Sequence, residues 1–480
     1  MRNLTLLTDF YELTMMNGYY EKGKDHEVAV FDVFFRQNQY ITYSIAAGLE
    51  QVVEYLENLH FADDDIAYLR SLNTFSEDFL KYLETFRFTG DLYSVPEGTF
   101  VFPGEPILTI HANILEAQLV EAAILNIVNH QTLIATKSAK VCDAAKGDKV
   151  MEFGLRRAQG PDAGIYGARA AIIGGCALTS NVLTGKIFDV PVSGTQAHSW
   201  IMDFPSELEA FRAYADVYPD GAMFLVDTYD TLTSGVPNAI KVFDELVKKG
   251  HKPVGVRIDS GDLAYLTKQA RKMLDEAGYG YTKICASGDL DERLIASLKN
   301  QGARIDLWGV GTKLITSADM PALGGVYKLS AIKHGDEYIP KIKLSNNSAK
   351  ITNPGFKTLY RVYDKDGMAF ADLIALKTDS FPEAQPLTLT HPVEKWKQTT
   401  FNAGEYSLRE LSVKIMENGK RIVKMPSLKQ ICDYCKQEKA TFWDEYKRID
   451  NPHIYKVDLS DALTSLKEGM IEKIRSEKIC

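Results

Sequence analysis

Short apolar runs alternate with amphipathic stretches through the middle of the chain. The runs are residues 150–153, 222–226, 254–258, 284–286 and 305–308. Each run is followed directly by Gly, Asp or Ser. Between them, residues 263–277 and 292–301 have the 3.6-residue period of an amphipathic helix. This alternation predicts parallel strands covered by helices, as in a doubly wound sheet or a (β/α) barrel.

The positions of the polar residues favour the barrel. A barrel gathers its functional residues on loops after several strands, whereas a dinucleotide-binding sheet concentrates glycines after its first strand. Here all five apolar runs end in such residues, and no Gly-x-Gly-x-x-Gly motif opens the chain. We therefore expect an α/β fold whose catalytic barrel covers residues 131–350.

The two flanking regions have other patterns. Residues 1–130 mix predicted helices (9–20 and 47–56) with a predicted strand (28–35) and a hairpin-like stretch (96–110), which indicates a separate α+β domain. Residues 351–480 mix short strands with charged helices and end in a predicted lysine-rich helix at 459–479. We find no internal repeat. The expected organisation is thus 1–130, 131–350 and 351–480.

Composition narrows the functional classes. The chain has 480 residues, 45% of them apolar and 25% charged, and a net charge of -9. That charge gives no general attraction to nucleic acid, so Arg, Lys and backbone N–H groups must hold any anionic ligand locally. No stretch approaches the roughly 18 apolar residues of a membrane span, and Met1–Thr5 does not resemble a signal peptide. We expect a cytoplasmic protein with neither a nucleic-acid nor a membrane partner.

The cysteines are scattered, which suits reduced thiols better than a disulfide framework. They are Cys142, Cys176, Cys285, Cys432, Cys435 and Cys480. Cys432 and Cys435 form a Cys-x-x-Cys pair, but a zinc site needs two further ligands and only His453 is near in sequence. We expect no metal there.

Two glycine-containing turns are candidates for a phosphate site. They are Ala286–Asp289 and Trp308–Lys313, and each lies between a predicted strand and a predicted helix. Bare glycine backbone lets N–H groups point at an oxyanion. Either turn alone is explained by glycine's freedom to adopt a positive φ angle. Two such turns on consecutive strands match the phosphate sites of barrels.

Two further segments place titratable residues at strand ends. Arg257 and Asp259 are two residues apart, so they share one face of a strand. Asp259 can bind ribose hydroxyls or cap the next helix, and we expect Ser260 to be a cap. His198 follows the run 190–192. If Asp227 binds one imidazole nitrogen, the other is left free as a base or nucleophile, although a purely structural histidine fits as well.

Seven ordered segments together carry a family resemblance. They are Thr8–Met15, Glu152–Arg157, Thr179–Val182, Gly194–His198, Leu225–Asp230, Arg257–Asp262 and Gly309–Thr312. Spread over about the first 330 residues, they resemble the nicotinate phosphoribosyltransferases. The resemblance implies an irregular (β/α) barrel beside an N-terminal α/β sandwich, with a C-terminal accessory region and a homodimeric assembly. Residues 351–480 show only a general likeness, and the Cys-x-x-Cys pair has no implied role.

The resemblance also implies the reaction. Nicotinate and phosphoribosyl pyrophosphate give nicotinate mononucleotide and pyrophosphate in NAD salvage, coupled to ATP hydrolysis with Mg²⁺ and without a tightly bound organic cofactor. His198 matches the histidine that ATP phosphorylates, and Asp227 matches its orienting partner.

Roles for the substrate-binding residues come from the same resemblance. Phe153 corresponds to the ring that stacks on the pyridine, and Tyr11 to the ring that the partner subunit places on its other face. Such stacking contributes about 0.5–1.5 kcal/mol beyond area burial. By the same resemblance, Arg156 contacts the base and phosphate, and Arg257 and Asp259 contact ribose and pyrophosphate. The implied contacts of the 5-phosphate are Ser287, Gly288, Gly309, Gly311 and Thr312. Lys328 is implied to bind a phosphate.

The choice of base depends on Asn181, with Ser180 beside it. The related nicotinamide enzyme has a carboxylate at this position, which would repel nicotinate's own carboxylate by about 1–4 kcal/mol. Asn181 can donate instead, so nicotinate is favoured. The alternatives are a nicotinamide phosphoribosyltransferase and a catalytically silent binding protein on the same scaffold. The presence of His198, Arg156, Asp227 and Asp259 argues against the silent protein.

Overall fold

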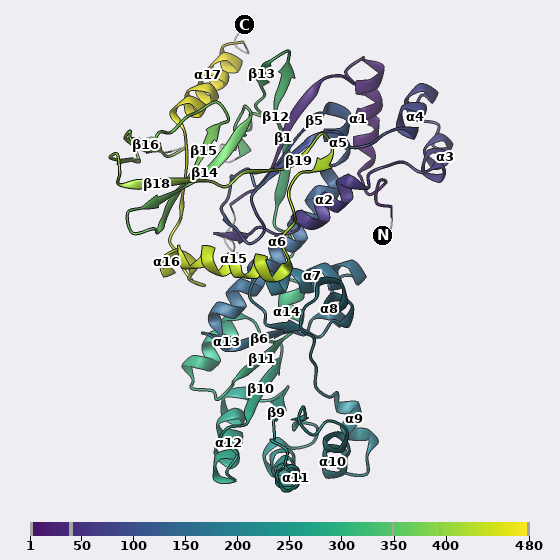
Figure 1. The fold of residues 1–480 in the computed structure, drawn as a ribbon, viewed down its shortest axis with the longest axis vertical. Coiled ribbons are helices and arrows are strands. Elements are labelled where there is room, and N and C mark those ends of the chain that lie inside the picture. The colour runs from purple at the N-terminus through teal and green to yellow at the C-terminus, as the bar shows by residue number, and fades with distance from the viewer. Residues whose placement is uncertain (1–2, 38–41, 348–349, 393, 395, 478–480) are drawn as a thin grey trace. The chain divides into compact units, whose positions relative to one another are not determined.

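The chain divides into two compact units. In the computed structural model, which describes residues 3–37, 42–347, 350–392, 394 and 396–477, one unit is formed by residues 1–133 and 322–480 and the other by residues 134–321 (Figure 1). The structure thus has two compact units, whereas the sequence suggested three segments. The three segments remain a prediction about domain boundaries. Within the described residues, no helix is long and apolar enough to cross a bilayer. Cys480 lies outside the described residues.

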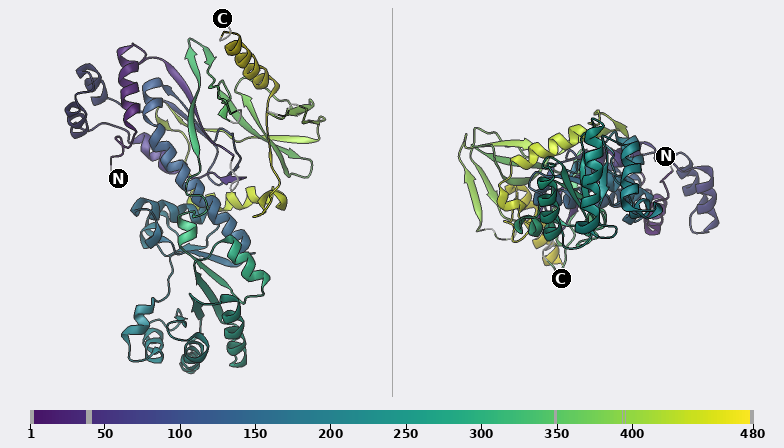
Figure 2. Two further views of the ribbon diagram at one scale, coloured as in Figure 1. Left: turned by 180° about the vertical axis from the view of Figure 1, so that it is seen from behind. Right: turned by 90° about the horizontal axis from the view of Figure 1, so that it is seen from below.

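The unit of residues 134–321 is built on one parallel sheet. Its strand order is β7-β6-β11-β10-β9-β8, and every pair is parallel. Figure 1 labels β6, β11, β10 and β9 of this sheet, and Figure 2 shows the same chain from behind and from below. The strands are β6 (Lys149–Glu152), β7 (Leu178–Thr179), β8 (Met223–Leu225), β9 (Gly255–Ile258), β10 (Lys283–Gly288) and β11 (Leu307–Val310). The predicted α/β class and the alternation of parallel strands with helices are confirmed. Closure into a barrel is not confirmed, because among the described residues no strand pairing joins β7 to β8.

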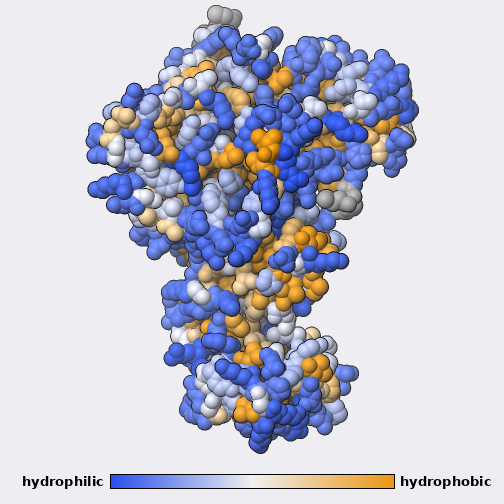
Figure 3. All heavy atoms as spheres, in the orientation of Figure 1, coloured by the Kyte–Doolittle hydropathy of each residue, from blue (hydrophilic) through white to orange (hydrophobic). Residues whose placement is uncertain are grey.

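Helices follow most of these strands. They are α7 (Pro161–Ile173), α8 (Val182–Phe188), α9 (His198–Asp203), α10 (Glu207–Val217), α11 (Val236–Lys248), α12 (Leu263–Glu276), α13 (Glu292–Asn300) and α14 (Thr312–Ile315), with a 3₁₀ turn η1 (Leu155–Arg157) and a π-helix η2 (Thr231–Gly235). Figure 3 shows apolar side chains gathered on the surface over α7 and α8. The side chain of Asp262 caps α12 by accepting from Tyr265 N. The expectation that Ser260 is a cap was therefore wrong, because the cap of α12 is Asp262, two residues later.

The unit of residues 1–133 and 322–480 contains an antiparallel sheet of seven strands drawn from distant parts of the chain. Its order is β13-β12-β1-β5-β3-β19-β20. The strands are β1 (Val28–Phe35), β3 (Asp91–Ser94), β5 (Leu108–Asn113), β12 (Gly325–His334), β13 (Glu337–Pro340), β19 (Val413–Glu417) and β20 (Lys420–Arg421). The C-terminal strand β19 pairs with the N-terminal strand β3. The last 125 or so residues are therefore integral to this unit.

The stretch 96–110 is not a hairpin. Its strand β4 (Phe100–Val101) pairs with β2 (Ser44–Ile45), whereas β5 pairs with β1 and β3. Pro103 and Pro106 lie between β4 and β5. Proline lacks the N–H that a strand ladder needs, so neither strand extends into this connection.

A second sheet of the same unit comes entirely from the C-terminal segment. Its order is β17-β16-β21-β15-β14-β18. The strands are β14 (Lys357–Asp364), β15 (Ala369–Leu376), β16 (Leu387–Thr390), β17 (Gln398–Phe401), β18 (Tyr406–Glu410) and β21 (Lys456–Leu459). The helices of this unit are α1 (Phe10–Glu21), α2 (Leu49–Glu57), α3 (Asp63–Ser71), α4 (Glu77–Glu84), α5 (Ile114–Leu119), the start of α6 (Glu121–Ala144), α15 (Leu428–Ala440), α16 (Asp444–Lys447) and α17 (Asp461–Glu477).

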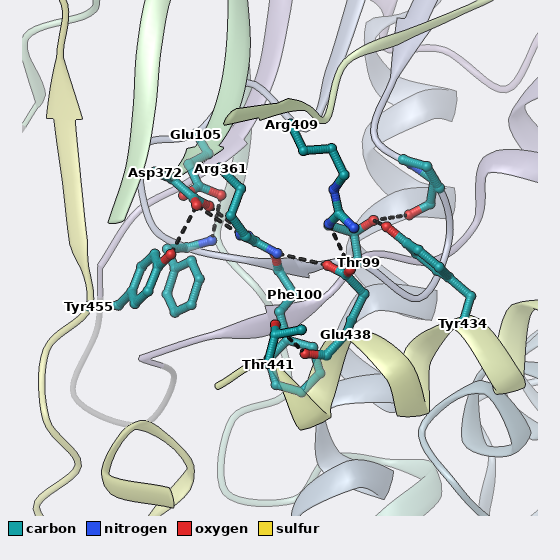
Figure 4. A network of polar contacts seen from close by, with 12 residues as sticks. Thr99, Phe100, Glu105, Arg361, Asp372, Arg409, Tyr434, Glu438, Thr441 and Tyr455 are labelled. Atoms are coloured by element: carbon teal, nitrogen blue, oxygen red, sulfur yellow. Dashed lines mark hydrogen bonds and ion pairs between the residues drawn. The ribbon is translucent and has the colours of Figure 1, made fainter. Parts of the chain in front are cut away.

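A buried ionic network ties the N-terminal segment to the C-terminal one (Figure 4). Arg361 is fully buried and contacts the carboxylates of Asp372 at 2.6 Å and Glu438 at 2.8 Å. Its guanidinium also donates to the backbone oxygen of Phe100 at 2.6 Å. Glu105, also buried, lies against Asp372, and both burial and this like charge raise its pKa well above its ordinary value. Burial and the neighbouring carboxylate therefore favour the protonated form of Glu105.

We expect Glu105→Gln to change how stability depends on pH. A carboxyl whose pKa is higher in the folded than in the unfolded state favours folding below the unfolded pKa of about 4.3 and loses that contribution as pH rises. Gln keeps an acceptor for Phe102 N and a donor for Asp372. The variant should therefore match the wild type near pH 4 and exceed its unfolding free energy at pH 8, by about 1.4 kcal/mol for each unit of pKa shift. Urea unfolding at both pH values measures this, and an unchanged pH slope would contradict it.

Candidate active site

Polar side chains meet at the carboxyl ends of neighbouring parallel strands. Because β8, β9 and β10 are adjacent and parallel, the residues after them share one edge of the sheet, where ligands of α/β folds bind. Asp227 follows β8, Asp259 follows β9 and Ser287 lies near the end of β10. The sequence patterns placed these three residues at strand ends, and the structure brings them into direct contact.

Arg257, Asp259 and Ser287 form a closed set of hydrogen bonds. Arg257 Nη2 donates to Asp259 Oδ1 at 2.7 Å and Nε donates to Ser287 Oγ at 2.7 Å. The hydroxyl of Ser287 donates in turn to Asp259 Oδ1. Burial opposes ionisation of Asp259, but the bond from Ser287 and the charge of Arg257 outweigh it and lower the pKa of this carboxyl. The set is therefore an ionised carboxylate beside a fixed guanidinium, suited to hydroxyls and phosphate oxygens respectively.

His198 is positioned by a buried carboxylate. It is the first residue of α9, and its Nε2 lies 3.2 Å from Asp227 Oδ1. The other oxygen of Asp227 accepts from Asp259 N at 2.8 Å and from Ser260 Oγ at 2.7 Å. Asp227 is 3% exposed and His198 is 42% exposed. Because a carboxylate only accepts, a neutral His198 carries its proton on Nε2 and its lone pair on Nδ1.

Phe153 lies between a cation and a glycine. The Arg257 guanidinium carbon is 5.8 Å from the centre of its ring. A Cβ on Gly309 would come within 2.7 Å of Cδ2 of this ring. Gly309 is therefore required where it is because the ring occupies the space of a side chain. Gly288 has a φ angle of +120°, and a Cβ there would meet Asp259 O at 2.8 Å.

Asn181 is held inside the protein. It is 2% exposed, and its Oδ1 accepts from the backbone N of Leu183 and Thr184, which caps α8. Its Nδ2 donates to Gly164 O at 3.1 Å. The sequence predicted a donor to the base and missed the cap, although Asn before a helix is a common cap. Ser180, beside it, donates its backbone N–H to Glu152 O.

The other predicted site residues in the unit of residues 134–321 follow the strands β6 and β11. Arg156 is exposed on the turn η1, three residues after Phe153. Gly311 immediately precedes α14, and Thr312 is its first residue. Among the described residues, no group of three or more His, Cys, Asp or Glu side chains is placed to hold a metal ion.

Sequence comparison agrees with this arrangement. Models described as the N-terminal domain, the family region and the C-terminal domain of nicotinate phosphoribosyltransferase match residues 6–129, 149–367 and 356–467. The chain is 46% identical to nicotinate phosphoribosyltransferase of Bacillus subtilis over 476 residues, which cover 99% of this chain and 96% of that protein. The chain belongs to the nicotinate phosphoribosyltransferase family. The resemblance seen in the seven sequence segments is thereby confirmed.

Two further relatives extend the comparison. Nicotinate phosphoribosyltransferase of Caenorhabditis elegans is 37% identical, covering 95% of this chain and 92% of its own. The crystal structure of human nicotinic acid phosphoribosyltransferase superposes with a TM-score of 0.86 and 29% identity, over 96% of this chain and 99% of that one. The mixed α/β fold is therefore that of a nicotinate phosphoribosyltransferase.

Two predicted site residues belong to the other compact unit. Tyr11 lies on α1 and is 47% exposed. Lys328 lies on β12, where its Nζ donates to Tyr327 O at 2.6 Å and is 3.8 Å from Glu121 Oε1. Burial of Glu121 raises its pKa to about 7. The roles of Tyr11 and Lys328 stay predictions from the family resemblance.

Sequence reasoning missed two residues that support the site, Thr195 and Glu152, and assigned a third, Ser260, to a helix cap. Thr195 Oγ1 accepts from Arg257 Nη1 at 2.7 Å, and Ser260 bonds to Asp227 rather than to a helix. Glu152, which precedes Phe153, is fully buried and accepts a hydrogen bond from the Thr179 hydroxyl. Thr195 and Glu152 both lie within segments that carry the family resemblance, and this was the signal that could have identified them. Neither the spacing of polar residues nor the hydrophobic period shows which residues they contact.

Proposed function

We propose that this chain transfers the phosphoribosyl group of phosphoribosyl pyrophosphate to nicotinate, giving nicotinate mononucleotide and pyrophosphate for NAD salvage. The observation that carries the proposal is 46% identity over nearly the whole chain to a protein named for this activity. The contacts of Arg257, Asp259 and Ser287 support it, because they supply a carboxylate for ribose hydroxyls and a guanidinium for pyrophosphate. The ring of Phe153 offers a stacking surface for the base.

Supporting roles follow from position. The nicotinate nitrogen attacks the ribose carbon that bears pyrophosphate, and the leaving group takes the bonding electrons. Arg257, with Arg156, is proposed to neutralise that charge. The turns holding Ser287, Gly288, Gly309, Gly311 and Thr312 are proposed to bind the 5-phosphate, and Lys328 another phosphate. We also infer that the parallel sheet is part of an irregular (β/α) barrel, which its strand-end site supports.

ATP and Mg²⁺ are part of the proposal. His198 offers Nδ1 as a nucleophile for the γ-phosphoryl group of ATP: the Nδ1–P bond forms as the bond from phosphorus to the bridging oxygen breaks, and ADP leaves with the bonding electrons. Asp227 holds the ring and stabilises its positive charge. Mg²⁺ commonly uses one or two protein carboxylates together with substrate phosphates, and the ionised, 28% exposed Asp259 fits such a role. Bound there, Mg²⁺ would supply charge neutralisation for the phosphates.

The base preference tests the proposed function. Purified protein is incubated with phosphoribosyl pyrophosphate and either nicotinate or nicotinamide, with and without ATP. Nicotinate should be preferred, and ATP should increase product formation. A preference for nicotinamide would reject the proposed role of Ser180 and Asn181 in base choice. Binding of both substrates without turnover would favour the silent binding protein.

We further propose a homodimer with shared active sites, in a cytoplasmic protein. Two exposed apolar surfaces support association. On α8 and η1, Leu155, Val182, Leu183 and Ile187 are 43–70% exposed. Around α1, Leu7, Phe10, Tyr11 and Met15 are 38–53% exposed. Clustered exposed apolar side chains mark interaction sites, and each cluster includes or adjoins a proposed substrate-binding residue.

Subunit mixing tests the sharing of Tyr11. The variants Tyr11→Ala and Arg156→Ala should each be nearly inactive as homodimers. In a mixed dimer with shared sites, one site carries both lesions and the other carries neither, so about half of the wild-type activity per heterodimer should return. Activity is measured on heterodimers isolated with two different affinity tags. Heterodimers that remain inactive would rule out a shared site.

A further inference from the structure

A buried carboxylate joins two segments of the proposed base pocket. Glu152, the last residue of β6, is fully buried. Its Oε1 accepts from Gly154 N, just after Phe153, and its Oε2 accepts from the Thr179 hydroxyl at 2.6 Å. Its backbone oxygen accepts from Ser180 N at 3.0 Å. One side chain therefore ties the turn after β6 to the end of β7.

The second segment continues the chain of bonds to Asn181. Thr179, also fully buried, accepts at Oγ1 from Asn181 N at 2.9 Å. Consecutive hydrogen bonds thus connect Glu152, Thr179 and Asn181, and each bond restricts the position of the next residue. The turn after β6 is closely packed, because a Cβ on Gly154 would lie 2.4 Å from Ile315 Cβ and 2.8 Å from Glu152 Oε1.

Stability alone does not explain a carboxylate here. Burial raises the pKa of Glu152, and the bonds from Thr179 and Gly154 oppose that shift only in part. A buried carboxylate bonded to neutral groups costs more free energy than a well-packed apolar side chain of similar volume. What Glu152 offers instead is two acceptors at fixed positions, one for each segment.

We propose that Glu152 is a positioning residue that fixes Phe153 relative to Ser180 and Asn181 and so sets the affinity for the base. This inference rests on the proposed nicotinate transfer. It predicts that loss of the carboxylate weakens recognition of the base far more than recognition of phosphoribosyl pyrophosphate, because Arg257, Asp259 and Ser287 make no hydrogen bond to it. Of the proposed phosphate contacts, Arg156 lies on the turn that Glu152 fixes.

Glu152→Gln tests the inference at constant size. Gln has one acceptor and one donor, so its NH₂ must face either Gly154 N–H or the Thr179 hydroxyl. The nicotinate KM should rise by about 10-fold or more, the loss expected for one hydrogen bond to a charged group. The KM for phosphoribosyl pyrophosphate should stay within about twofold. Glu245→Gln, which changes a half-exposed carboxylate on α11, is the matched control and should leave both KM values unchanged.

Threonine variants keep the test decisive if Glu152→Gln fails to fold. Thr179→Val removes the hydroxyl and should raise the nicotinate KM selectively, whereas Thr179→Ser restores the hydroxyl and should recover most of that loss. Equal rises in both KM values, or an unchanged nicotinate KM in folded Glu152→Gln, would overturn the inference. If wild-type protein makes no product from nicotinate, the proposed function itself has failed, and this control is measured first.

Discussion

Replacing His198 by Asn should leave a folded protein that has lost ATP hydrolysis, by a factor on the order of 10³ or more as expected for removal of a nucleophile. The physical reason is the loss of Nδ1, since the Asn amide nitrogen has no lone pair available for attack. Slow ATP-independent synthesis should survive, because Phe153 and the Ser287 cradle are untouched. Nicotinate and ATP turnover are measured in the same reaction mixtures.

The chain offers a matched control for this variant. His251 Nδ1 lies 2.9 Å from Asp220 Oδ1, so a second His–Asp pair exists at the protein surface. His251→Asn should leave both ATP hydrolysis and ATP-stimulated synthesis unchanged. If His198→Asn behaved like His251→Asn, His198 would be a structural histidine and the ATP-coupled mechanism would lose its nucleophile.

Arg361→Met should produce the largest loss of stability. The substitution keeps much of the side-chain volume but leaves Asp372 as a buried carboxylate without its cation and leaves Glu438 with Arg409 alone, at 2.6 Å. Breaking a buried pair in this way costs about 3–5 kcal/mol. Because the network joins residues near 100 to residues 361–438, the unit of residues 1–133 and 322–480 should unfold at lower temperature or denaturant concentration. Calorimetry and urea titration measure the loss.

An exposed arginine provides the comparison for Arg361. Arg212 pairs with Glu245 at 2.7 Å, but their side chains are 45% and 36% exposed. Surface pairs contribute about 0–1 kcal/mol, so Arg212→Met should have a small effect. Equal losses in the two variants would show that burial of the Arg361 network does not determine its contribution.

The sequence predicted local elements well where the hydrophobic period was clear. The helix beginning at Leu263 appears where the pattern placed it because it buries one face, and the strand 28–35 appears because it is a mostly apolar run buried on both faces. Strand pairing was harder. The hairpin predicted at 96–110 failed because the partners of β4 and β5 are set by distant strands, and the pairing of β3 with β19 crosses more than 300 residues.

In the candidate site, too, local patterns were predictable from the sequence and long-range contacts were not. Residue types after each strand predicted that Asp227, Arg257 and Asp259 would lie at one edge of a sheet. The partner of His198 was only a hypothesis, since Asp227 is 29 residues away, and the structure places it at 3.2 Å. Local pattern did not reveal Glu152 or Thr195, because their contacts depend on how separate strand ends approach one another.

Labelling from γ-labelled ATP tests the central claim most directly, because it asks whether energy coupling runs through His198. Wild-type protein should acquire an acid-labile, base-stable label that is discharged when nicotinate and phosphoribosyl pyrophosphate are added, in step with formation of nicotinate mononucleotide. His198→Asn should acquire none, and His251→Asn should label like the wild type. Equal labelling of wild type and His198→Asn would contradict the account.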